Sequence, residues 1–188
     1  MITFAEAFAK TKTTKYNHKY HFFYQDILGS RKIESVLEIG AWQGQSLYSW
    51  KMIWPDAVIE CIDLDRKYDL KLENDFKIYN FNTTDKETVD NNIKRTYDVI
   101  IDDGSHHWRD QTKTFYNLYN KADKFYVLED IQGEYSLAKL KETLPSIVFE
   151  NSLLCTPTDS PTRDFRFSDY TEIGGRFKVL FIPAGLEF

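Results

Sequence analysis

Short apolar runs alternate with longer segments of helical periodicity along most of this chain. The apolar runs occupy residues 36–39, 57–62, 76–79, 97–101 and 125–128. Nearly continuous apolar character, rather than strict alternation, is typical of strands that are covered on both faces. The segment after Gly44, the segment 85–94 and the segment from Trp108 onward carry apolar residues at helical spacing. This order predicts an α/β protein with a mostly parallel sheet and right-handed crossovers.

The length of 188 residues suits a single domain with a full-sized core. Within residues 1–188 we expect three regions. These are a helical lead-in over 1–34, a cofactor-binding and metal-binding core over 35–131, and C-terminal strands with a substrate loop over 132–188. The lead-in carries two amphipathic segments, near 2–9 and 20–28. In the last region we expect strands at 147–154 and 177–182, with a polar loop at 156–175 that faces the substrate.

The net charge of −5 argues against a protein whose main role is to bind nucleic acid, because such domains usually carry a basic surplus. No apolar run approaches the ~20 residues needed to span a bilayer. The first residues lack the basic-then-apolar profile of a signal peptide. Cys61 and Cys155 form neither a zinc pattern nor a disulfide framework. We therefore expect a cytoplasmic protein with no nucleic-acid or membrane partner.

The first apolar run leads directly into a segment with two glycines four residues apart, Gly40 and Gly44. Gly40 permits a tight turn at the strand end, and Gly44 lets a ligand approach the start of the following helix. Exposed N–H groups at a helix start favour an anion, such as the methionyl carboxylate of S-adenosylmethionine. The spacing departs from G-x-G-x-x-G, which disfavours a dinucleotide. A turn between any strand and helix can also require a glycine.

The second apolar run ends at Asp63, about twenty residues beyond Gly44. In Rossmann-like sites, an acidic residue at this strand end can accept hydrogen bonds from both ribose hydroxyls. The glycine turn and Asp63 together favour a nucleoside-containing cofactor more strongly than either feature alone.

Acidic residues follow the fourth and fifth apolar runs. The fourth run continues into the segment 102–107, which reads Asp-Asp-Gly-Ser-His-His, and the fifth continues into Glu129 and Asp130. If these strands are neighbours, their ends lie ~5 Å apart, so that Asp103, Glu129 and Asp130 can converge. Three crowded carboxylates repel one another unless a cation lies among them. Oxygen ligands suit Mg²⁺ or a similar divalent ion.

A divalent cation at this place could bind a substrate hydroxyl and lower its pKa. His106 could then remove the proton as a general base, and the oxygen would attack the methyl group of the sulfonium. A structural role is also open for these residues. Asp102 or Ser105 can cap the helix that starts near Trp108, and the acidic pair after the fifth run can form surface ion pairs. His107 is better explained as a neighbour than as a second base.

These segments resemble the macrocin O-methyltransferase family, which includes mycinamicin sugar methyltransferases and cephalosporin-biosynthesis relatives. The resemblance covers roughly residues 15–131. It rests on the segments 36–46, 98–106 and 129–130, together with Asp63 and the lead-in segment 15–20.

The resemblance implies a Rossmann-like class I methyltransferase fold, with a mostly parallel seven-stranded sheet, an antiparallel final hairpin and helices on both faces. It implies S-adenosylmethionine and Mg²⁺ as cofactors, and His106 as the catalytic base. The expected metal ligands are Asp103, Glu129 and Asp130. The expected cofactor-binding residues are Glu38, Gly40, Ala41, Gly44, Ser46, Asp63, Asn82 and Asp102.

From these features we expect a divalent-metal-assisted O-methyltransferase that acts on a hydroxyl of a sugar, a glycan or another small molecule. A homo-oligomer is compatible with the sequence. Three alternatives stay open. The first is a catechol-type O-methyltransferase, although that class usually has Asp-Asn where this chain has Glu129-Asp130. The others are an NAD-dependent oxidoreductase and a non-catalytic module that binds S-adenosylmethionine.

Overall fold

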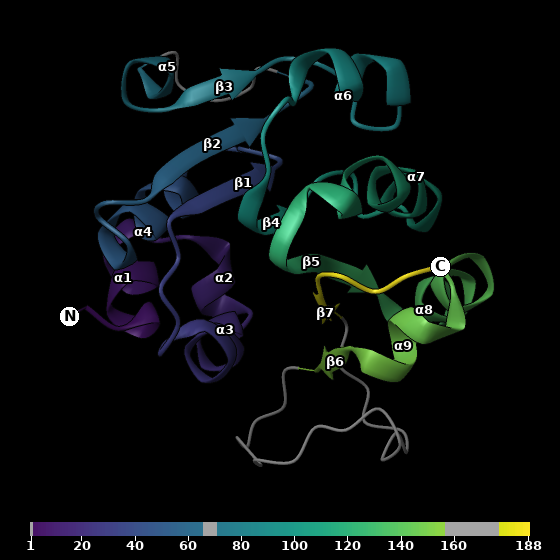
Figure 1. Ribbon diagram of the computed structural model, residues 1–188. Helices are drawn as coiled ribbons and strands as arrows, with labels where there is room; N and C mark the ends of the chain where they lie inside the picture. The colour runs from purple at the N-terminus through teal and green to yellow at the C-terminus, as the bar shows by residue number, and fades with distance from the viewer. Residues whose placement is uncertain (1, 66–70, 157–176) are drawn as a thin grey trace.

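A seven-stranded sheet in the order β3-β2-β1-β4-β5-β7-β6 forms the centre of the protein (Figure 1). The computed structural model describes residues 2–65, 71–156 and 177–188. The strands are β1 (Ser35–Ile39), β2 (Val58–Ile62), β3 (Lys77–Tyr79), β4 (Tyr97–Asp102), β5 (Ala122–Gln132), β6 (Leu153–Cys155) and β7 (Phe177–Pro183). Strands β1 to β5 are parallel, whereas β7 is antiparallel to both β5 and β6. The expected α/β class is confirmed, with a mixed sheet.

Helices cover both faces of the sheet (Figure 1). They are α1 (Phe4–Thr11), α2 (Thr14–Asn17), α3 (Tyr20–Leu28), α4 (Gln45–Ile53), α5 (Leu72–Asp75), α6 (Lys86–Asn92), α7 (Trp108–Leu118), α8 (Gly133–Thr143) and α9 (Ser146–Asn151), with a 3-10 turn at Tyr119–Lys121. Helices α1, α3 and α4 share one hydrophobic core with the sheet, and helices α6 to α9 share the other. Among the described residues, no helix is both long and apolar enough to cross a membrane.

Side chains of the central strands alternate between these two cores. Val36 and Val99, which are partners in the β1–β4 pairing, face the core of α1, α3 and α4. Leu37 and Ile100, the next pair along, face the core of α6 to α9. Because both faces are buried, successive residues of one strand must all be apolar. This explains why these strands appear in the sequence as continuous apolar runs.

Aromatic packing fixes the lead-in helices against the sheet. The ring of Trp50 in α4 lies 5.2 Å from that of Phe8 in α1 and 5.1 Å from that of Tyr24 in α3, measured between ring centroids. All three side chains are fully buried. Contacts of this kind stabilise through both area burial and ring geometry. The lead-in is therefore part of the main core. Its position places α2 at the carboxyl ends of the central strands.

The C-terminal region differs from the sequence prediction. The strand expected at 147–154 is wrong, because this segment divides into α9 and β6. Pro145 is the N-cap residue of α9, and Val148 and Phe149 of the helix turn into the core. A short apolar run does not by itself distinguish a buried helix from a strand. Helix α8 was not expected, and the loop expected at 156–175 lies almost entirely outside the described residues.

Candidate active site

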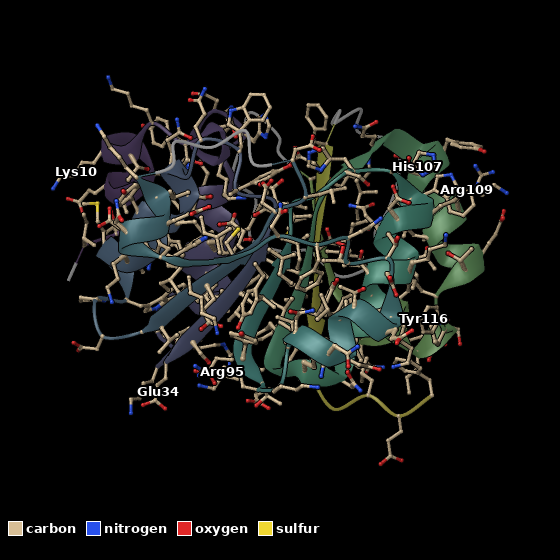
Figure 2. All side chains as sticks on the ribbon, turned by 90° about the horizontal axis from the view of Figure 1, so that it is seen from above. Lys10, Glu34, Arg95, His107, Arg109 and Tyr116 are labelled. Carbon is tan, nitrogen blue, oxygen red and sulfur yellow. The ribbon has the colours of Figure 1, made fainter. Side chains whose placement is uncertain are left out.

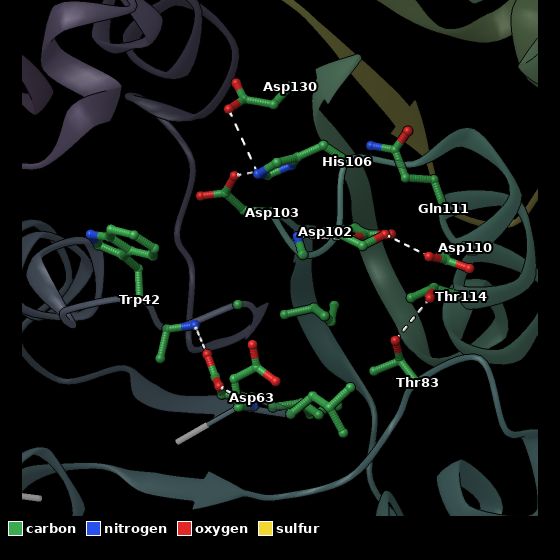
Figure 3. Close-up of a pocket in the computed structure, with 18 of the residues that line it drawn as sticks. Trp42, Asp63, Thr83, Asp102, Asp103, His106, Asp110, Gln111, Thr114 and Asp130 are labelled. Atoms are coloured by element: carbon green, nitrogen blue, oxygen red, sulfur yellow. Dashed lines mark hydrogen bonds and ion pairs between the residues drawn. The ribbon is translucent and has the colours of Figure 1, made fainter. Parts of the chain in front are cut away.

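A cavity of about 490 Å³ opens at the carboxyl ends of the parallel strands (Figure 3). Its walls come from the turn after β1, the end of β2, the segment after β3 and the loop after β4, with Asp130 from β5. Ligands of open α/β sheets bind beyond these strand ends. Glu34 and Arg95 precede β1 and β4, so they mark the amino ends of these strands, and His107 lies in the loop after β4, at the carboxyl end. In the view from above, Glu34 and Arg95 lie far from His107 (Figure 2).

The glycine turn after β1 is packed directly against the loop after β4. Gly40 has a φ of +93°, and a Cβ atom added to it would lie 2.3 Å from the carbonyl oxygen of Asp103. Gly44 has a φ of +81° and precedes α4, and a Cβ atom there would lie 2.4 Å from the side chain of Leu72. At Gly40 only glycine meets both the backbone and the steric requirement, whereas at Gly44 the positive φ is the main reason for glycine.

Most of the predicted cofactor-binding residues line the cavity: Gly40, Ala41, Ser46, Asp63, Asn82 and Asp102. Glu38 and Gly44 are not among the residues that line it. Glu38 is fully buried and accepts hydrogen bonds of 2.9 Å from the Ser46 hydroxyl and from the indole N–H of Trp50. Its carboxylate therefore joins β1 to α4 below the cavity wall.

The carboxylate of Asp63 is held at the end of β2 by backbone donors. Its Oδ2 accepts a 2.7 Å hydrogen bond from the N–H of Ala41, and its Oδ1 accepts one of 2.9 Å from the N–H of Asp65. The bond from Ala41 ties the end of β2 to the turn after β1 (Figure 3), and the bond from Asp65 is local to the segment after β2. The carboxylate thus has a fixed position in the cavity wall.

The wall near β3 combines apolar and polar groups. Phe81 and Leu64 contribute apolar surface, and the hydroxyls of Thr83 and Thr114 lie 2.8 Å apart. Asn82 lines the same region, where its Oδ1 accepts a 3.0 Å hydrogen bond from the N–H of Thr84. Its side chain therefore shapes the local turn.

Asp102 lies in the middle of the cavity wall, and its side chain is buried. The carboxylate accepts a 3.3 Å hydrogen bond from the N–H of Gly104 and one of 3.4 Å from the hydroxyl of Tyr126. Burial raises the pKa of Asp102 to about 7, which those two weak hydrogen bonds do not offset. The N-cap of α7 is His107, whose Nδ1 accepts from the N–H of Arg109, and not Asp102 or Ser105.

Three predicted site residues meet at the other end of the cavity (Figure 3). Nδ1 of His106 lies 3.9 Å from Oδ1 of Asp103, and Nε2 of His106 lies 4.0 Å from Oδ2 of Asp130. One possible ligand atom from each residue falls within 4.8 Å of the others, so this group could hold a metal ion. Nδ1 of His106 has no hydrogen-bond partner among the described residues.

The backbone at two of these residues is left-handed. His106 has a φ of 58° and Asp130 a φ of 51°, in a region that residues other than glycine adopt infrequently. Asp130 lies where the pairing of β5 with β7 shifts register between Leu128 and Ile131. A register shift of this kind bends a strand and redirects its side chains. Here it turns Asp130 toward the cavity.

Glu129, the third predicted metal ligand, is placed differently. Its side chain is fully buried, one carboxylate oxygen binds the ammonium of Lys15, and the other accepts from the hydroxyl of Tyr24. It is therefore not among the residues of the possible metal group. The structure brings Glu129 and Asp103 together through Lys15, which lies between them.

Lys15 is the cation at the rim of the sheet that sequence reasoning missed. Its Nζ lies 2.5 Å from Oδ2 of Asp103 and 3.2 Å from Oε1 of Glu38, and its side chain is 2% exposed. Burial alone would lower its pKa, but the carboxylates of Asp103, Glu129 and Glu38 hold the pKa of Lys15 well above its usual value. Lys15 is therefore a buried, charged ammonium.

The sequence gave little indication that three further residues, Tyr20, Tyr24 and Gln111, belong to the site. Tyr20 and Tyr24 are four residues apart on α3, and their hydroxyls bond to Asp130 and Glu129. Their helical spacing places them on one face, but it does not reveal their partners. Gln111 lines the cavity and donates a 2.9 Å hydrogen bond to the carbonyl of Glu129. Its buried Oε1 accepts no bond from the described residues.

Comparisons with known proteins place the fold. No protein-family model matches the chain, and no curated protein matches it either. Among solved structures, it is similar to the MycE methyltransferase of the mycinamycin biosynthetic pathway in complex with Mg and SAH, at 21% identity and a TM-score of 0.64. It is also similar to the CurJ carbon methyltransferase, at 13% identity and a TM-score of 0.61. A third match is a candidate caffeoyl-CoA O-methyltransferase from Staphylococcus aureus, at 14% identity and a TM-score of 0.58.

The matches differ in how much of each protein they include. The MycE match covers 95% of this chain and 54% of MycE, so the chain spans about half the length of that enzyme. The CurJ match covers 96% and 57%, and the Staphylococcus aureus match 87% and 82%. At these identities the shared feature is the fold. The resemblance expected from the sequence is confirmed at that level, as a methyltransferase fold.

Proposed function

We propose that this chain binds S-adenosylmethionine in the cavity and transfers its methyl group to a hydroxyl of a sugar, a glycan or another small molecule. One observation carries the proposal. A single cavity extends from the Gly40 turn and Asp63 to the group formed by Asp103, His106 and Asp130. A methyl donor and a hydroxyl acceptor could therefore meet within it.

The wall of the cavity suits the parts of the methyl donor. The start of α4, which has no side-chain cap, would offer backbone N–H groups to the methionyl carboxylate. Asp63, fixed by the N–H of Ala41, is the acceptor for the ribose hydroxyls. The apolar surface of Leu64 and Phe81 would pack against adenine. The donor would then extend toward the loop after β4.

The residues at the far end of the cavity fit a divalent cation in part. Asp103 and Asp130 offer carboxylate oxygens, which Mg²⁺ prefers, and His106 lies between them. Glu129 is committed to Lys15 and Tyr24, so it does not join this set. When bound, a cation on the two aspartates would attract the acceptor hydroxyl and lower its pKa.

His106 is the group that would take the proton of the acceptor. His106 lines the cavity, and one ring nitrogen of its neutral imidazole can accept a proton. The carboxylates of Asp103 and Asp130 lie within 4.0 Å of its ring nitrogens, so a positive charge formed on the ring would be stabilised. The cavity wall then contributes by holding donor and acceptor in line.

The test is methyl transfer from methyl-labelled S-adenosylmethionine to a panel of sugars, glycosides and catechols, with and without Mg²⁺. His106→Asn should lower transfer by about a hundredfold or more, the usual contribution of a general base. It should leave Mn²⁺ affinity within severalfold, whereas Asp130→Asn should weaken it. The matched control is His107→Asn, since asparagine can also cap α7. Full activity in His106→Asn would contradict the assignment, and donor binding without any transfer would indicate a binding module.

A further inference from the structure

We propose that Lys15 is a built-in cation of the candidate active site, which takes the place of a metal ion between Asp103 and Glu129. By neutralising these carboxylates it positions the loop after β4, so that the methyl donor can bind without a metal. Lys15 is thus a positioning residue rather than a catalytic one. This inference rests on the proposed function, because it concerns the same cavity.

The ammonium joins three separate parts of the sheet edge. Glu38 belongs to β1, Asp103 to the loop after β4, and Glu129 to the end of β5, and each has a carboxylate oxygen in contact with Nζ of Lys15. Such carboxylates would otherwise repel one another in a region of low dielectric. The three contacts therefore hold the ends of three strands in register with one another.

The geometry around Glu129 favours an ammonium over a metal ion. Both of its oxygens already have donors, the ammonium of Lys15 and the hydroxyl of Tyr24. The side chains of Lys15 and Glu129 are 2% and 1% exposed, which leaves little access for the waters that Mg²⁺ usually retains. A metal ion could enter only if the lysine moved away.

The position of Asp103 links this charge to the donor cavity. Asp103 lines the cavity, and its carbonyl oxygen faces Gly40 at a distance that excludes any side chain there. The loop that carries Asp103 therefore shapes the turn expected to bind the methionyl group. Loss of the Lys15 ammonium should release this loop, because Asp103 then loses the ion pair that links it to Glu38 and Glu129.

The experiment measures binding rather than catalysis. S-adenosylhomocysteine is titrated by calorimetry into the full chain in EDTA and in Mn²⁺, and bound Mn²⁺ is counted by electron paramagnetic resonance. In the wild type, the affinity for S-adenosylhomocysteine should be the same within about twofold under both conditions. In Lys15→Met it should fall by about tenfold or more in EDTA. In Mn²⁺ it should recover, with one further Mn²⁺ ion bound per chain, because the freed carboxylates then hold a metal ion.

Two further variants separate charge from packing. Lys10→Met changes an exposed lysine of α1 in the same way and should behave as the wild type. Lys15→Met combined with Glu129→Gln removes one charge of each sign, so it should fold even if the single variant does not. This double variant should gain no Mn²⁺ site.

Some results would overturn the inference without touching the proposed function. These are loss of S-adenosylhomocysteine binding by the wild type in EDTA, and a folded Lys15→Met variant that gains no Mn²⁺ and is not rescued by it. Failure of S-adenosylhomocysteine to bind under any condition would instead contradict the proposed function. The Mn²⁺ count would still decide the role of Lys15.

Discussion

The ammonium nitrogen of Lys15 lies 2.5 Å from Oδ2 of Asp103, although 88 residues separate the two in the chain. This contact places α2, a four-residue helix of the lead-in, at the edge of the central sheet. The lead-in therefore supplies charge to the candidate active site in addition to packing against the core. The electrostatics of the cavity depend on Lys15, a residue of the lead-in segment 15–20 to which the sequence assigned no role of its own.

Gly40 should be far less tolerant of alanine than Gly185. Both have positive φ values, of +93° and +80°, but an added Cβ atom meets the Asp103 carbonyl at 2.3 Å only in the first case. Both substitutions carry a conformational cost of roughly 1–2 kcal/mol. Gly40→Ala should lower the free energy of unfolding by more than that, on the order of 3 kcal/mol or greater, because the backbone must also move. Urea denaturation measures both, and equal losses would disprove the close approach.

Asp102 should make the stability of the protein depend on pH. Burial raises its pKa from 3.8 to about 7, so the folded state binds this proton more tightly than the unfolded state. The contribution to stability is fully present below pH 4 and is lost as the pH rises through 7. The loss amounts to on the order of 4 kcal/mol at most. The free energy of unfolding of the wild type, relative to Asp102→Asn, should therefore fall between about pH 4 and pH 7 and level off above pH 7. A constant difference would show that Asp102 titrates normally.

Tyr24→Phe should destabilise the protein through the carboxylate of Glu129. The variant keeps the ring, which packs against Trp50, and removes the hydroxyl that donates to the buried oxygen. A buried group left without its partner costs about 1–3 kcal/mol. Tyr135→Phe, at a ring that is 67% exposed, is the matched control and should change stability by less than about 0.5 kcal/mol. Similar values for the two variants in thermal or urea unfolding would refute this role of Tyr24.

Local sequence patterns correctly predicted the buried central strands of the sheet, because burial on both faces requires a run of apolar residues in the sequence itself. The runs before Gly40 and before Asp102 are buried on both faces, and this produced the continuous apolar pattern of β1 and β4. The strand prediction for the segment 147–154 was wrong because burial does not distinguish a strand from a helix. Its buried apolar residues Val148, Phe149 and Leu154 belong to a six-residue helix followed by a short strand, and apolarity alone does not separate the two.

The site was less predictable because its contacts are tertiary. Asp103 and His106 follow β4, and Asp130 lies near the end of the neighbouring strand β5, so their meeting at one edge could be expected from strand order. The position of Glu129 could not be expected from strand order. It depends on the register shift in β5 and on the ion pair with Lys15 of α2. A lysine in a polar stretch is ordinarily a solvated residue, and its sequence neighbours gave no sign of burial.

The most direct test of the account is calorimetric titration of S-adenosylhomocysteine into the wild type, Asp63→Ala and Asp56→Ala. Asp63 lines the cavity at the end of β2, whereas Asp56 is an exposed aspartate shortly before the same strand. We predict micromolar binding to the wild type and to Asp56→Ala, weakened by about tenfold or more in Asp63→Ala. Absence of binding to the wild type, or equal binding to all three proteins, would contradict the assignment of this cavity to a methyl donor.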